Sequence, residues 1–101
     1  MLVAFSVLPS GGEAGDSFHD AVAAAVKVVR ASGLPNRTDS MFTTLEGEWD
    51  EVFDVIRRAA DAVSAYGKRV DLVLKADIRP GHGNELTGKL ERLEQAIARQ
   101  P

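Results

Sequence analysis

Apolar residues recur at the spacing of an amphipathic helix in three segments of the chain. In the first segment Ser17 is the expected N-cap, Asp20 its capping-box partner and Gly33 the terminator. The second segment runs from about Glu48 to Tyr66, and the third ends near Arg99. The three apolar stripes are Val22, Ala25, Val26 and Val29; then Val52, Phe53, Ile56, Ala59, Ala60 and Val63; then Leu86, Leu90, Leu93 and Ile97. The pattern predicts three helices.

Other segments favour β-strands, because they are short and either β-branched or alternate between the two faces of a sheet. Leu2 to Leu8 predicts a strand that Pro9 closes, and Val70 to Arg79 predicts another. Between the first two helices the sequence predicts a hairpin. Its strands are expected near Arg37 to Asp39 and from Phe42 to Glu46.

The resulting order is β-α-β-β-α-β followed by a C-terminal helix, which is the ferredoxin-like arrangement. This α+β fold has an antiparallel sheet with both crossover helices on one face. A chain of 101 residues is long enough for one domain and too short for two. We therefore expect residues 1–101 to form a single domain.

The two faces of the predicted sheet are expected to differ. Side chains alternate along a strand, so the face toward the helices should carry Val3, Phe5, Val7, Leu72, Leu74 and Ile78. The opposite face should carry Leu2, Ala4, Ser6, Leu8, Val73, Lys75, Asp77 and Arg79. The apolar share of this open face predicts cover by the last helix or by a second copy of the chain, so we expect a homodimer or homotetramer. The alternative is a half-apolar sheet exposed to water.

Charge and composition argue against several classes of protein. The net charge of −3 at pH 7 disfavours a sequence-independent grip on nucleic acid or anionic lipid. The absence of cysteine removes disulfides, thiolate metal sites and cysteine nucleophiles. No stretch approaches the ~20 apolar residues that span a bilayer, and the first residues lack the basic region of a signal peptide. We expect a cytoplasmic protein with no nucleic-acid or membrane partner.

The stretch FTTLEGEWDE, residues 42–51, joins a predicted strand to a predicted helix. Its glycine supplies a tight turn, and three acids lie at the start of the helix, where negative charge favours the positive helix end. These acids, Glu48, Asp50 and Glu51, need no other role. Trp49 is expected to pack against the entry of the helix.

Three residues of the same stretch are candidates for a binding site. Glu46 lies at the strand end, where a side chain can look into the crevice beside the helix N-terminus. Thr43 and Thr44 point to opposite sides of the sheet, so at least one hydroxyl faces the interior or a covered surface. A buried hydroxyl or carboxylate needs a hydrogen-bonding partner, which is either backbone or a small polar ligand.

The stretch TTLEGEWDEV resembles the junction signature of the single-domain thiamine-binding protein family, T-x-(hydrophobic)-E-G-x-(aromatic). The opening MLVAFSVLP, the SGL after the first helix and the later LKADIR are also similar to that family, so the resemblance covers nearly the whole chain. The resemblance implies a ferredoxin-like fold that is commonly a homotetramer. It also implies binding of thiamine, or of its hydroxymethylpyrimidine half, without turnover and without a further cofactor.

Carried over to this chain, the resemblance favours Thr43, Thr44 and Glu46 as ligand-facing residues. Several relatives have glycine or asparagine where this chain has Phe42, a difference that narrows the pocket or supplies a stacking ring. A carboxylate accepts a hydrogen bond from the amino group of an aminopyrimidine, and a threonine hydroxyl both donates and accepts. Acidic surroundings suit the cationic thiazolium half. The candidate stacking rings are Phe42, Phe53 and Trp49.

Two other functions remain open. Dimeric α/β-barrel enzymes share this element order and act on a small substrate in an apolar cavity, where His82 is the candidate acid–base residue. The other is an interaction module that changes its oligomeric state when a metabolite binds. His19 and His82, without cysteine, make a weak zinc site. The alternating Lys75, Asp77 and Arg79 favour a charge network or an anion contact at a subunit boundary.

Overall fold

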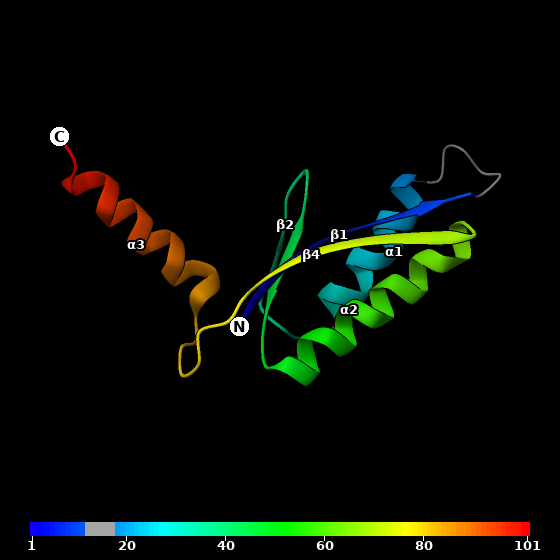
Figure 1. Ribbon diagram of the computed structural model, residues 1–101, viewed down its shortest axis with the longest axis horizontal. Helices are drawn as coiled ribbons and strands as arrows, with labels where there is room; N and C mark the ends of the chain where they lie inside the picture. Colours follow the sequence, from blue (N-terminus) through cyan, green and yellow to red (C-terminus); the bar gives the residue numbers. More distant parts are fainter. Residues whose placement is uncertain (12–17) are drawn as a thin grey trace.

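The computed structural model describes residues 1–11 and 18–101 and confirms the ferredoxin-like α+β fold in the predicted order of elements (Figure 1). The strands are β1 (Leu2–Ser10), β2 (Asn36–Thr38), β3 (Thr43–Glu46) and β4 (Arg69–Asp77). The helices are α1 (Phe18–Ala31), α2 (Trp49–Val63), which continues into a 3₁₀ turn (Ser64–Tyr66), and α3 (Glu85–Arg99). The predicted N-cap Ser17 lies outside the described residues.

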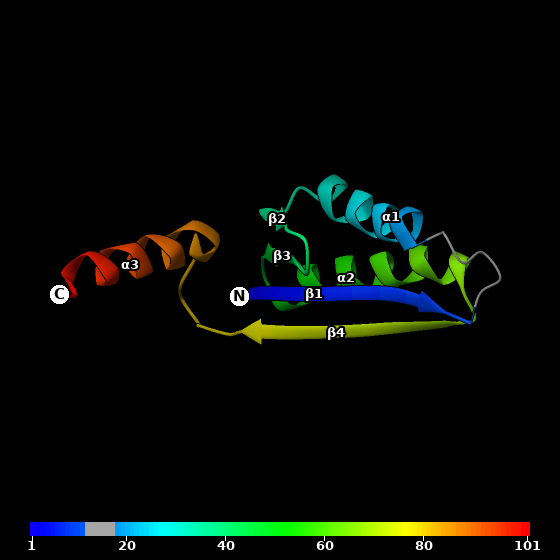
Figure 2. The same ribbon diagram turned by 90° about the horizontal axis from the view of Figure 1, so that it is seen from above.

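The strands pair antiparallel in the order β2-β3-β1-β4, and α1 and α2 cover one face of the sheet (Figure 2). The core lies between this face and the two helices. Its largest fully buried side chains are Val3, Val29, Leu45, Val52, Ile56 and Val63. The first two predicted stripes reach this core, with differences in each. In α1, Ala21 is buried and Val22 is exposed; in α2, Val55 is buried, whereas Phe53 and Ala60 are only partly buried.

Strand β1 does not end where the sequence predicts, because it continues through Pro9 to Ser10. Met1 and Gly47 exchange both of their backbone hydrogen bonds, at 2.8 and 3.1 Å. Backbone groups alternate sides along an antiparallel strand, so those of odd-numbered residues in β1 point toward β3 and those of even-numbered residues toward β4. Strand β3 pairs with β1 only as far as Phe5. Pro9 therefore costs no ladder hydrogen bond, and the strand tolerates it.

The outer strand β4 is left largely uncovered by the helices. The register sets Leu72 opposite Val7 and Leu74 opposite Phe5, which confirms that these leucines share the helix-facing side of the sheet. They are nevertheless 41% and 36% exposed. Ile78, predicted for the same face, follows the end of β4 and is also exposed. An edge strand with exposed apolar side chains is a surface on which another chain can pack.

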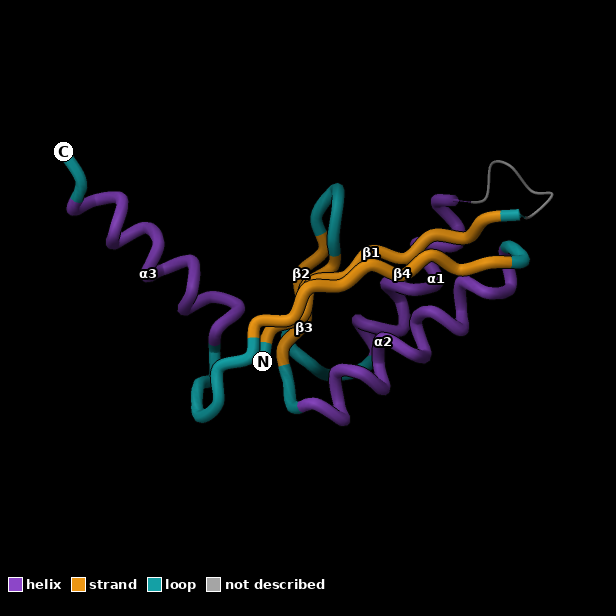
Figure 3. Tube along the Cα trace, viewed as in Figure 1, coloured by secondary structure: helices purple, strands orange, loops and turns teal. Residues whose placement is uncertain are grey.

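Helix α3 projects from one end of the molecule instead of lying across the open face of the sheet (Figures 1 and 3). The molecule measures 52 × 32 × 19 Å, and its radius of gyration of 15.4 Å exceeds the ~13 Å of a compact chain of this length. The apolar stripe of α3, formed by Leu90, Leu93 and Ile97, is exposed along its length. Helix α3 thus does not supply the predicted cover for its own open face, where Leu8 and Val73 remain exposed.

Candidate functional site

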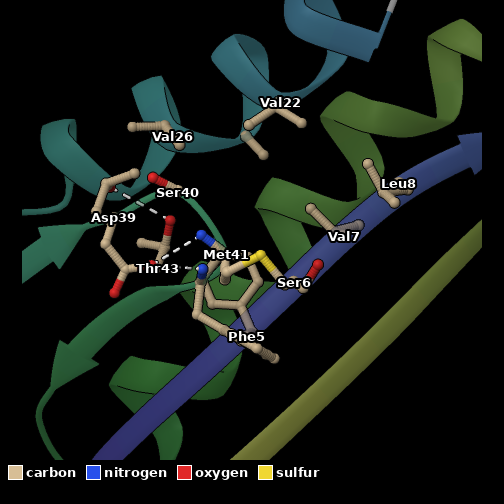
Figure 4. Close-up of a pocket in the computed structure, with 13 residues that line it drawn as sticks. Phe5, Ser6, Val7, Leu8, Val22, Val26, Asp39, Ser40, Met41 and Thr43 are labelled. Atoms are coloured by element: carbon tan, nitrogen blue, oxygen red, sulfur yellow. Dashed lines mark hydrogen bonds between the residues drawn. The ribbon is translucent and has the colours of Figure 1, made fainter.

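A pocket of about 250 Å³ opens on the helix-covered side of the sheet, between β1, α1 and the β2–β3 hairpin (Figure 4). The hollow exists because β3 stops pairing with β1 at Phe5 and the hairpin turns away, so the next residues of β1 have no neighbouring strand on that side. The residues that line it include Phe5, Val7, Val22, Val26, Phe42 and Thr43. The exposure of Val22 follows from its place in this wall.

Thr43 brings a hydroxyl group to this pocket. The register sets Thr43 opposite Phe5 on the helix-facing side and Thr44 opposite Ala4 on the open side, which confirms that the two threonines point in opposite directions. The Thr43 side chain is buried, and its hydroxyl lies 3.3 Å from that of Thr38. A threonine hydroxyl can donate one hydrogen bond and accept others, so Thr43 retains capacity for a ligand.

The turn of the hairpin adds a carboxylate, Asp39, that the sequence analysis missed as a site residue. Its Oδ1 accepts hydrogen bonds from the backbone N–H groups of Met41 and Phe42, at 2.8 and 3.0 Å. These bonds lower the pKa of Asp39 below its usual value, so the group is negatively charged at neutral pH. The sequence could have indicated this turn, because an aspartate at the start of a turn accepts a hydrogen bond from the backbone N–H two residues later.

Glu46 lies on the opposite face of the sheet from this pocket. It pairs with Leu2 and is only 7% exposed. Its two carboxylate oxygens accept hydrogen bonds from the backbone N–H groups of Glu85, at 2.8 Å, and Leu86, at 3.2 Å. The carboxylate therefore caps the N-terminus of α3, where the first N–H groups of a helix lack internal partners. The predicted contact of Glu46 with a ligand stays a prediction.

The first half of α3 carries two ion pairs, one within the helix and one to β4. Arg92 reaches Glu85 at 2.6 Å, and Lys89 reaches Asp77 at 2.6 Å. In each pair the hydrogen bond from the cation lowers the pKa of the acid, so both acids are charged at neutral pH. The partner of Asp77 is thus a residue of α3 in the same chain.

Thr44 lies in a second hollow, on the open face. This hollow of about 290 Å³ lies between the sheet and α3 and is lined by Leu2, Arg37, Asp39, Thr44, Glu85, Leu86, Lys89 and Leu90. The two predicted threonines therefore belong to different hollows. Only Thr43 shares its hollow with Phe42.

The last predicted site residue, Phe53, lines neither hollow. Its ring stacks on Trp49 one turn away on α2, with centroids 5.3 Å apart and planes inclined by 15°. Trp49 also borders a third hollow, together with His82. The stacking on Phe53 packs the indole at the helix entry, as predicted.

At the same helix entry Glu51 accepts a hydrogen bond from the backbone N–H of Glu48, at 3.1 Å, which supports a structural role for these two acids.

Two features are absent from residues 1–11 and 18–101, a metal-binding cluster and a membrane-spanning helix. No group of three histidine, aspartate or glutamate side chains there is arranged to hold a metal ion. No helix in the same residues is long and apolar enough to cross a bilayer.

The fold and the pocket define a small ferredoxin-like protein with a hollow beside its hairpin. The chain belongs to the thiamine-binding protein family, which it matches over residues 3–94. It is 47% identical over 100 residues to the UPF0045 protein Mb1933 of Mycobacterium bovis, an alignment that covers 98% of this chain and 96% of that protein.

Solved structures agree with this assignment. A Bacillus cereus protein described as a domain of unknown function, DUF77, superposes with a TM-score of 0.80 at 34% identity, over 90% of this chain and 86% of that one. A Thermotoga maritima protein, whose name proposes a role in thiamine biosynthesis or salvage, superposes with a TM-score of 0.73 at 26% identity. That match covers 90% of this chain and 97% of the other.

Proposed function

We propose that this protein binds thiamine or its hydroxymethylpyrimidine half, without turnover, in the pocket between β1, α1 and the hairpin. The observation that carries the proposal is the convergence of Thr43, Phe42 and Asp39 on one hollow in a chain of the thiamine-binding family. At about 250 Å³ the hollow lies just below the ~300–1,000 Å³ usual for ligand pockets, which suits a single substituted ring.

The chemistry of the pocket matches the two halves of thiamine. The aminopyrimidine offers flat apolar faces for Phe5 and Phe42 and polar ring atoms for the hydroxyl of Thr43. The thiazolium half is cationic, and the ionised carboxylate of Asp39 stands in the turn beside the pocket. Apolar walls with a few placed polar groups are the usual composition of a small-molecule site.

Calorimetric titration with thiamine and with hydroxymethylpyrimidine tests the proposal directly. We expect Thr43→Val to weaken binding by about tenfold, because one hydrogen bond is lost from a partly desolvated site. Thr44→Val is the matched control: the substitution is the same and the residue is the next one along, but it faces the other side of the sheet. The proposal fails if neither compound produces heat at millimolar concentration.

Asp39→Asn should discriminate between the two compounds. The asparagine Oδ1 still accepts the hydrogen bonds from Met41 and Phe42, so the turn is retained while the charge is removed. Because Asp39 is exposed and screened, we expect thiamine to bind about threefold more weakly and the neutral hydroxymethylpyrimidine to be unaffected. Calorimetry at low and high salt checks this, since only the thiamine difference should shrink with salt. An equal loss for both compounds would contradict a role for charge.

A homo-oligomer is part of the proposal. The exposed stripe of α3 and the uncovered apolar side chains of the open face, Leu8 and Val73, favour burial against a second copy. The enzyme alternative receives less support, because its candidate acid–base residue, His82, borders a different hollow from the one that holds Thr43.

A further inference from the structure

On the side of β1 that faces β3, one backbone N–H and one C=O, those of Val7, make no hydrogen bond within the sheet. The reciprocal hydrogen bonds of Met1 and Gly47 set the phase of the strand, so the N–H and C=O of Val7 point to the same side as those of Phe5, toward β3. Phe5 is paired with Thr43, the last β3 residue in the ladder. The next position on that side, Val7, lies beyond the end of β3.

The backbone groups of Val7 face the pocket without a partner in the part of the chain that the structure describes. Val7 lines the pocket and is only 5% exposed. The strand phase makes its pairing with Leu72 of β4 a non-hydrogen-bonded one, and no other hydrogen bond within residues 1–11 and 18–101 reaches its N–H or C=O. Buried backbone donors and acceptors are nearly always paired, so this position favours a ligand. Two residues further on, Pro9 has no N–H to offer.

This edge suits a small ring better than a peptide. A peptide strand needs several backbone pairs in a row, whereas here Phe5 is already bonded and Pro9 lacks a donor. The hairpin turn at Ser40 and Met41 also borders the hollow. What remains is one donor beside one acceptor, both from Val7.

We propose that Val7 binds the aminopyrimidine edge-on, its N–H donating to a ring nitrogen and its C=O accepting from the adjacent amino group. This mode rests on the proposed function and specifies how the site selects its ligand. The ring continues the sheet where β3 stops, in the hollow that Val22 and Val26 of α1 line together with Phe42 and Thr43. The ligand class is therefore a flat ring with an amino group next to a ring nitrogen.

Backbone amide NMR on the wild-type protein, combined with calorimetry, tests this mode. At thiamine concentrations 100 times the Kd, exchange of the Val7 amide with solvent should slow by about a hundredfold, because the free fraction falls by that factor. The amides of Ser6 and Leu8 are internal controls, since they point toward β4 and should change little. A pyrimidine that lacks the amino group should bind at least about tenfold more weakly.

The outcomes separate this inference from the function on which it rests. Heat of binding with an unchanged Val7 amide overturns the edge-on mode and leaves thiamine binding intact. Absence of heat overturns both. Protection of Val7 together with weak binding of the ring without the amino group supports both.

Val7→Pro and Val7→Ala provide a second test. Both remove the valine side chain from the core, but only proline removes the N–H, and Pro9 shows that this side of β1 accepts proline. Val7→Pro is expected to bind thiamine at least about tenfold more weakly than Val7→Ala. Equal affinity of the two variants would refute the edge-on mode, and the NMR measurement decides the matter if Val7→Pro does not fold.

Discussion

Replacing Glu46 with alanine is expected to release α3 from the sheet. Glu46 is only 7% exposed, and its carboxylate accepts hydrogen bonds from the backbone N–H groups of Glu85 and Leu86. The substitution therefore removes two charge-assisted hydrogen bonds from a largely buried place. We expect the free energy that holds α3 in position to fall by about 3 kcal/mol. Hydrogen exchange of the α3 amides, followed by mass spectrometry, should accelerate by about a hundredfold, since 1.4 kcal/mol corresponds to a factor of ten.

Two further variants sharpen this prediction. Asp50→Ala removes an exposed acid from the same stretch and should leave exchange of α3 unchanged. Glu46→Gln keeps the size of the side chain but replaces one accepting oxygen with an NH₂ group, so it should also loosen α3. If Glu46 is a cap only, thiamine affinity in Glu46→Gln stays close to wild type. A large loss of affinity with α3 still in place would instead support the ligand contact that the sequence predicts.

Leu93→Glu should dissociate the proposed oligomer into monomers of 10.8 kDa. Leu93 lies in the middle of the exposed stripe of α3 and is 52% exposed in the isolated chain. A carboxylate there would be buried without a partner in the proposed contact, at a cost of several kcal/mol, which is enough to dissociate a dimer of micromolar affinity. Size-exclusion chromatography with light scattering measures the mass directly.

Gln95→Glu is the matched control for this experiment. It adds the same charge to α3 two residues away, on the opposite side of the helix from Leu93, where the residue is exposed. The mass of this variant should equal that of the wild type. If Leu93→Glu keeps the wild-type mass, or if the wild type itself is a monomer, the stripe is not the contact between copies.

Element type and order could be predicted from the sequence because they depend on local periodicity. The stripe in residues 52–63 recurs every three to four positions, and the alternation in residues 70–79 has a period of two; each produces its element wherever it stands. The predicted end of β1 was wrong because the effect of Pro9 depends on which neighbour its backbone faces. That is a property of the sheet and not of the proline.

The candidate site was only partly predictable, because it depends on the register between strands. Alternation implies that the side chains of Thr43 and Thr44 point to opposite faces of the sheet. The pairing of β3 with β1 decides that Thr43 is the one that lines the pocket. Glu46 finds its partner in Glu85, 39 residues away, and no local pattern reveals such a contact. Asp39 could have been selected from its turn chemistry, whereas the unpaired edge at Val7 could not.

The sequence by itself determined the secondary structure, the ferredoxin-like order and the family, because these depend on short-range periodicity and on motifs that lie within a few residues. The tertiary structure alone decided which face each polar group occupies, that α3 leaves its own sheet uncovered, and that β1 presents a free edge beside the hairpin. These features arise where segments far apart in the chain meet. The packing of the whole sheet, and not any local pattern, fixes the register of its strands and the length over which they pair.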